Sequence, residues 1–141
     1  MAYYSSASLA WPAPGPMDVP SYQVSGVPWL TSSIAPSAGT LKITFPDTTR
    51  WVEVQNRGVA DLRIGFSANG VLGNPPTTAH HFILPAVTGS TTRWELRCSS
   101  IYFSGPNGAT EFSLAAGLTG IPAQYFDDMS GSLGGIYSGV G

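Results

Sequence analysis

Between residues 39 and 118 the chain consists of short runs in which apolar and polar side chains alternate, separated by turn residues. In one such run Leu41, Ile43 and Phe45 alternate with polar neighbours. A period of two places alternate side chains on opposite faces of an extended strand, so each run predicts a strand with one buried face. No run shows a convincing helical period of 3.6 residues. The pattern favours an all-β fold.

The predicted strands lie at residues 39–45, 50–56, 60–67, 80–85, 92–98, 100–105 and 110–118. Seven or eight strands at this spacing predict a single jelly roll, or antiparallel β-sandwich, of about eight strands. Between the last two runs, Pro106, Asn107 and Gly108 have the composition of a hairpin turn. The dipeptide Asn69–Gly70 is typical of a turn with positive φ.

Residues 1–38 differ from this domain because they hold six of the 12 prolines in the chain. Proline lacks the amide donor and biases the preceding residue toward extended geometry, so the segment is expected to form an extended arm. Its aromatic residues are unusual for a disordered tail; they are Tyr3, Tyr4, Trp11, Tyr22 and Trp29. We expect these rings to find pockets either on a neighbouring subunit or on the arm's own domain.

The sequence thus divides into an arm at 1–38, a sandwich domain at 39–122 and a Gly/Ser-rich tail at 123–141. The tail carries Ile136 and Tyr137 among its small residues. Either the tail is flexible or these two side chains thread into a contact.

Charged residues are scarce, at 10% of the chain, with six Lys+Arg and a formal net charge of −2. A surface with so few cations cannot neutralise the phosphates of a nucleic-acid groove, so we expect no direct nucleic-acid partner. Uncharged surface on a folded domain is often buried against another protein, which favours assembly. The sequence also lacks a basic, apolar signal segment and a long apolar run, so neither ordinary secretion nor membrane insertion is expected.

Few residues are placed to do chemistry. His80 and His81 are neighbours within a predicted strand, where they would point to opposite faces and could not chelate one ion together. Asp127 and Asp128 are likewise adjacent in a predicted loop, where solvation or helix capping is the commoner role. Cys98 shares a face with Trp94 in an alternating run and is expected to be a core thiol. We therefore expect no enzyme, no metal site and no cofactor.

Four segments occur in order along residues 50–141: "WVEVQNRGVADLRIGFSANGV", "TRWELRCSSIYFSG", "FSLAAGLTGIP" and the closing "SGVG". In this order they resemble the small single jelly-roll penton proteins of large icosahedral double-stranded DNA viruses. The resemblance implies an eight-stranded jelly roll, present in five copies at each capsid vertex of the virion. It also implies contacts to double jelly-roll major capsid proteins and to minor capsid proteins, and it brings no catalytic residues.

A closed ring of five uses a heterologous interface, in which one flank of each subunit meets the opposite flank of the next. Trp51 is out of phase with its apolar neighbours and is a candidate for an outward contact. Charged residues near it are candidates for fixing the register of that contact; they are Arg50, Arg57 and Arg63, with Glu53 and Asp61.

Two other classes of function fit the same features. A carbohydrate-binding module would use exposed aromatic rings as a stacking platform, and the chain has four Trp and six Tyr. A phage-type decoration or cement protein would share the sandwich and the arm but would bind an already closed shell as a trimer or monomer.

Overall fold

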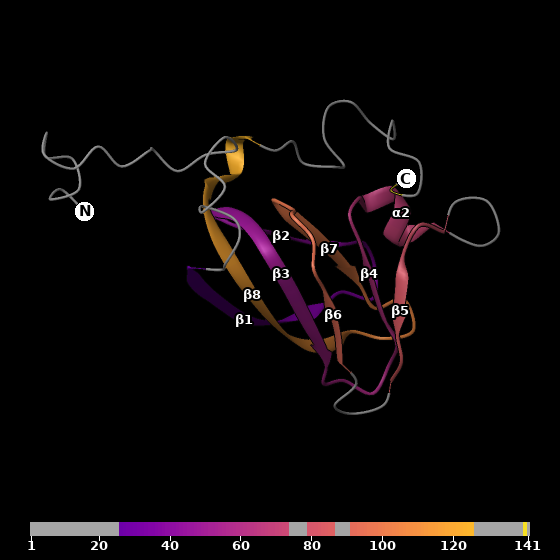
Figure 1. Cartoon of the computed structure of the whole chain (residues 1–141). Coiled ribbons are helices and arrows are strands. Elements are labelled where there is room, and N and C mark those ends of the chain that lie inside the picture. The colour runs from indigo at the N-terminus through magenta and orange to yellow at the C-terminus, as the bar shows by residue number, and fades with distance from the viewer. Residues whose placement is uncertain (1–25, 74–78, 87–90, 126–139, 141) are drawn as a thin grey trace, which may run out of the picture.

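The computed structural model describes residues 26–73, 79–86, 91–125 and 140. Within these residues eight strands form two antiparallel sheets that face each other, with one short helix and one 3-10 turn (Figure 1). In chain order the elements are β1 (Val27–Ala35), β2 (Leu41–Thr44), β3 (Asp47–Asn56), β4 (Leu62–Gly65), α2 (Ala68–Leu72), β5 (Phe82–Leu84), β6 (Thr91–Trp94), β7 (Ser100–Ser104), β8 (Thr110–Pro122) and η2 (Ala123–Tyr125). The predicted all-β sandwich of about eight strands is confirmed.

The strand order explains how the chain reaches this arrangement. The first sheet has the order β1-β8-β3-β6 and the second β2-β7-β4-β5. The antiparallel pairs are nested: β1 pairs with β8, β2 with β7, β3 with β6, and β4 with β5. Further pairing of β3 with β8 and of β4 with β7 completes the sheets. A long antiparallel hairpin wound into two facing sheets gives this order, which is that of a jelly roll.

The core fills the space between the sheets. Phe103 of β7 stacks on Phe112 of β8 with ring centroids 4.2 Å apart, which joins the middle strands of the two sheets. The other fully buried large side chains come from the inward faces of the strands and from the residues beside them: Phe45, Leu62, Ile64, Ile101, Leu114, Leu118, Ile121, Val52, Val54 and Val71. Burial of each such side chain stabilises the fold by roughly 1.5 to 3 kcal/mol. The alternation predicted for β3 is observed, because Val52 and Val54 are buried while Trp51 and Glu53 are partly exposed.

β1 occupies residues that we placed in the arm. It pairs with β8 along its whole length, so the sandwich begins at residue 27 rather than at residue 39. The alternation was hidden because polar Thr31 and Ser33 lie on the same face as Trp29. Pro28 is tolerated because β1 lies at the edge of its sheet, where one side of the strand needs no ladder partner. From residue 26 to 35 the arm therefore lies on its own domain.

Two local predictions were wrong. The turn after β7 is present, with the amide of Gly108 donating to the carbonyl of Gly105 at 2.9 Å. However, β7 and β8 belong to different sheets, so the turn passes between the sheets and forms no hairpin. Asn69–Gly70 lies inside α2 and has no positive φ. The hydroxyl of Ser67 accepts a hydrogen bond from the Gly70 amide and caps this helix, a local signal that the dipeptide obscured.

Candidate functional site

The described residues hold no group of three or more His, Cys, Asp or Glu side chains that could bind a metal ion. Cys98 is 2% exposed, and burial raises the pKa of its thiol from 9.0 to about 11, although a hydrogen bond with Thr49 opposes the shift. A thiol that stays protonated is a poor nucleophile, which confirms the prediction of a core cysteine. Within the same residues no helix is long and apolar enough to cross a membrane.

The two histidines precede β5 and do not lie in it, which corrects their predicted placement in a strand. Both reach one carbonyl of α2: the His80 amide donates to the carbonyl of Gly70 at 3.2 Å, and Nδ1 of His81 lies 2.9 Å from the same oxygen. Nδ1 of His80 is buried without a hydrogen-bond partner. The pair therefore fixes α2 to β5 and does not form a chelating site. Asp127 and Asp128 lie outside the described residues.

The four edge strands of the sandwich differ in how they are protected against pairing with another chain. β2 carries Lys42, β6 carries Arg93, and β5 is only three residues long. Charges and short length both discourage edge-to-edge association. β1 has nine residues and no charge. It is the least protected edge in the described part of the chain.

The outward face of β1 adds exposed apolar area to this edge. Leu30 is 74% exposed and Ile34 is 60% exposed, four residues apart on one face. We call these two residues the β1 flank. On the other side of the sandwich β5 runs beside β6 of the facing sheet, and we call its residues Phe82 and Ile83, each 49% exposed, the β5 flank. As neighbours in a strand these two side chains point to opposite faces of the sheet, and the Phe82 ring packs on Trp94. β1 and β5 lie on opposite sides of the sandwich in Figure 1.

Between these flanks the outer face of the first sheet is hollowed. The central strand β8 presents small side chains there, because Ser113 and Ala115 face outward between longer residues of β1 and β3. The resulting outer trough has a volume of about 540 Å³. It is lined by Leu30, Thr31, Ser32, Glu53, Gln55, Thr91, Ser113, Leu114 and Ala115.

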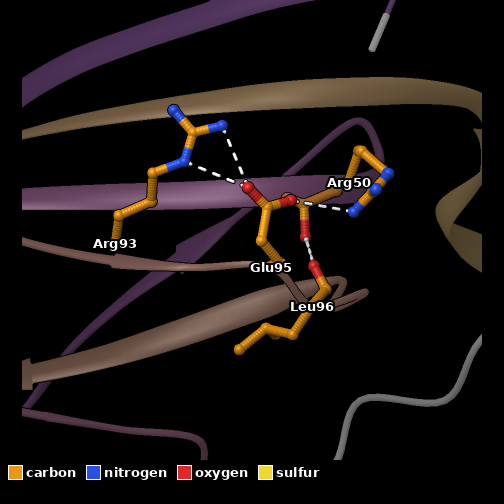
Figure 2. A network of polar contacts seen from close by, with 5 residues as sticks. Arg50, Arg93, Glu95 and Leu96 are labelled. Carbon is orange, nitrogen blue, oxygen red and sulfur yellow. Dashed lines mark hydrogen bonds and ion pairs between the residues drawn. The ribbon is translucent and has the colours of Figure 1, made fainter. Parts of the chain in front are cut away.

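A polar network closes the trough on the β6 side. Arg93 lies with its guanidinium carbon 4.4 Å from the ring centroid of Trp51 and forms an ion pair with Glu95 at 3.0 Å. Glu95 also pairs with Arg50 at 2.8 Å, so this carboxylate lies between two guanidinium groups (Figure 2). A longer pair, at 3.9 Å, joins Arg93 to Glu53. The side chains of the pairs are 40 to 52% exposed, so each pair is worth only about 0 to 1 kcal/mol.

The structure gives the predicted interface residues different surroundings. Trp29 packs its ring against Phe45 at a centroid distance of 5.1 Å and belongs to the core boundary of its own chain. Arg63 donates to the carbonyls of α2 and of the residue after it. Arg57 is exposed, and its predicted role at an interface stays a prediction.

Other predicted interface residues lie outside the described part of the chain: Tyr3, Tyr4, Trp11, Tyr22, Ile136 and Tyr137. Sequence reasoning missed the β1 flank and the β5 flank. Their apolar residues are visible in the sequence, but only the strand order shows that they lie at edges.

Comparison with known proteins leaves the family open. No protein-family model matches the chain, and no curated protein matches it. Among solved structures, the crystal structure of PirA is similar with a TM-score of 0.38 and 16% identity, over 62% of this chain and 91% of that one. A likeness at this level is too low to assign a fold or a function.

Proposed function

We propose that this chain is a structural virion protein: a penton subunit that forms five-fold capsid vertices as a homopentamer and contacts major and minor capsid proteins. The number five and the viral context come from the sequence resemblance over residues 50–141. The jelly-roll strand order agrees with the fold that this resemblance implies. The described residues also hold no group of three or more His, Cys, Asp or Glu side chains that could bind a metal ion.

One observation carries the proposal, namely the two apolar flanks on opposite sides of the sandwich. A ring forms when one surface of a subunit binds a different surface of the next, and the rotation closes. The β1 flank and the β5 flank are two such surfaces: Leu30 and Ile34 share one face of β1, whereas Phe82 and Ile83 lie on opposite faces of the edge strand β5. Burial of the apolar side chains that face the neighbouring subunit supplies a driving force that needs no charge complementarity.

The tryptophans disfavour the carbohydrate-binding alternative. A sugar-stacking platform needs a free aromatic face. Trp51 is covered by Arg93, Trp29 packs on Phe45, and Trp94 meets Phe82 at a centroid distance of 5.6 Å. All three tryptophans in the described residues therefore already have partners.

Two flank variants test the heterologous contact. Leu30→Lys with Ile34→Lys removes the β1 flank, and Phe82→Lys with Ile83→Lys removes the β5 flank. Each double variant alone is expected to be monomeric, because every contact in a ring needs both flanks. Mixed one to one, they retain one complementary pair and are expected to form a dimer that cannot grow.

Native mass spectrometry of the two variants and of their mixture provides the measurement. A mixture that stays monomeric would contradict the pairing of the two flanks. Electron microscopy of the wild-type assembly then gives its symmetry. Five-fold rings support a penton, whereas three-fold particles would overturn the penton and favour a decoration protein.

A further inference from the structure

Val140 lies against the N-terminal end of α2. The hydroxyl of Ser67 donates a hydrogen bond to the main-chain carbonyl of Val140. Oγ of Ser67 also accepts a hydrogen bond from the amide of Gly70 at 2.9 Å. Ser67 is 4% exposed, so both its donor and its acceptor are used away from solvent. The acceptor caps the helix, and the donor holds the penultimate residue of the chain.

Gly70 shapes the surface that receives this carbonyl. A Cβ atom at Gly70 would overlap the carbonyl oxygen of Val140 and would also lie 2.9 Å from Oγ of Ser67 and 3.0 Å from the carbonyl oxygen of His80. Backbone atoms cannot move aside as a flexible side chain can. The close approach of Val140 is therefore possible only with glycine at position 70.

Several contacts hold this surface in place. The carbonyl of Gly70 accepts from the amide of His80 at 3.2 Å and lies 2.9 Å from Nδ1 of His81. At the other end of α2, Arg63 donates to the carbonyls of Val71 and Gly73 at 3.3 and 3.4 Å. Because these hydrogen bonds already hold α2 in place, little conformational entropy is lost when the site binds its ligand.

We propose that Ser67 and Gly70 form a binding site for Val140 of this same chain, recognised through its main-chain carbonyl. Without that carbonyl the buried Ser67 hydroxyl would have no acceptor for the hydrogen bond that it donates, and an unsatisfied buried donor costs free energy. Because Ser67 and Val140 belong to one chain, the contact forms within the molecule and does not depend on protein concentration. The proposal is independent of the penton role.

Carboxypeptidase digestion of the full-length protein tests this site, because the enzyme can remove Gly141 and Val140 only when the terminus is released. In the wild type, release of these two residues is expected to be slower than from a free synthetic peptide of residues 134–141. In Gly70→Ala the rate of release of Gly141 and Val140 is expected to rise about two- to tenfold, which is the change that the loss of one net hydrogen bond produces. Release from the wild type at the rate of the free peptide would overturn the proposal.

Gly58→Ala is the matched control. A Cβ atom at Gly58 would also clash, because it would lie 2.8 Å from Cγ2 of Thr110. Val140 is not among the atoms that it would meet. If general loosening of the fold exposes the terminus, both variants accelerate release equally, and the proposal fails. Selective acceleration in Gly70→Ala supports it.

Ser67→Asp separates capping from binding. Aspartate at this position can still accept from the Gly70 amide, but when ionised it has no proton for the Val140 carbonyl. Release faster than from the wild type is the expected result, and unchanged release would count against the proposal. Protection in the wild type that depends on protein concentration would show that the terminus binds a second copy, which contradicts the assignment to the same chain.

Discussion

The two edges of the first sheet are built differently. β1 pairs with β8 along all nine of its residues, has no charge and exposes the β1 flank. β6 pairs with β3 over only four residues and presents Arg93 within a network of ion pairs. β1 is thus strongly attached to its own sheet yet open to another chain, while β6 is weakly attached and covered by polar groups. In the assembly that we propose, this difference favours contact through β1 and not through β6.

Beyond β6 the chain stays attached to β3 through the backbone and the side chain of Thr49, whose amide donates to the carbonyl of Cys98 at 3.1 Å. The hydroxyl of Thr49 donates to the carbonyl of Leu96 at 2.9 Å and accepts from the amide of Cys98 at 3.0 Å. Side-chain hydrogen bonds replace ladder pairs where regular pairing ends. The β6 edge therefore depends on a few polar and buried groups, whereas β1 depends on its backbone.

Removal of β1 is expected to have the largest effect. A chain that lacks residues 1–36 loses one of the two strand partners of β8 and the ring that packs on Phe45, so its unfolding free energy should fall by more than about 4 kcal/mol. A chain that lacks only residues 1–25 keeps β1 and is expected to melt cooperatively. Circular dichroism during thermal unfolding compares the two. Cooperative melting of the shorter chain near the wild-type temperature would show that β1 is dispensable.

The loss of unfolding free energy at alkaline pH tests the burial of Cys98, which follows β6 in the chain. Burial raises the pKa of Cys98 to about 11, so the folded chain keeps a proton that the unfolded chain loses above pH 9.0. The stabilisation is complete below pH 9 and is lost as the pH rises toward 11, at about 1.4 kcal/mol per pH unit, or roughly 2 to 3 kcal/mol in all. Urea unfolding of the wild type and of Cys98→Ala measures this difference. An identical alkaline loss in the variant would mean that Cys98 is not its source.

A single charge on β1 should have a smaller effect, on association alone. Leu30→Lys removes an exposed apolar side chain from the β1 flank and is expected to weaken self-association about tenfold or more. Its stability as a monomer should change by less than about 0.5 kcal/mol because the site is exposed. Thr91→Lys on β6 is the matched control and should leave association unchanged. Sedimentation velocity measures both variants, and equal weakening would remove the contrast between the edges.

The smallest effect is expected in the ion-pair network. Glu95→Gln removes the carboxylate between Arg50 and Arg93, and the unfolding free energy should change by no more than about 1 kcal/mol. The change should decrease further in 1 M salt, where exposed pairs are screened. Chemical denaturation at low and high salt provides the measurement. A loss of several kcal/mol would show that the β6 edge needs its charges to fold.

The sequence predicted best the strands whose two faces differ most. β3 and β8 alternate buried aliphatic residues such as Val52 and Leu114 with partly exposed ones, so their period of two was clear. β1 was missed because Thr31 and Ser33 weaken that contrast. α2 was missed because five residues are too few to show a helical period.

The candidate site was harder to predict for a different reason. Whether Leu30 or Phe82 lies at an edge depends on which strands pair, and pairing over long sequence separations leaves no local pattern. The contact between Ser67 and Val140 joins residues 73 positions apart and is equally invisible in the sequence. Trp51 was correctly predicted to face outward, but its partner Arg93 depends on the pairing of β3 with β6.

The native mass of the full-length protein over a range of concentrations tests the central claim most directly. We predict a concentration-dependent pentamer in the wild type, which the double substitution Leu30→Lys and Ile34→Lys converts to a monomer. A wild-type protein that remains monomeric up to its solubility limit, or a pentamer that survives the double substitution, would contradict assembly through the β1 flank.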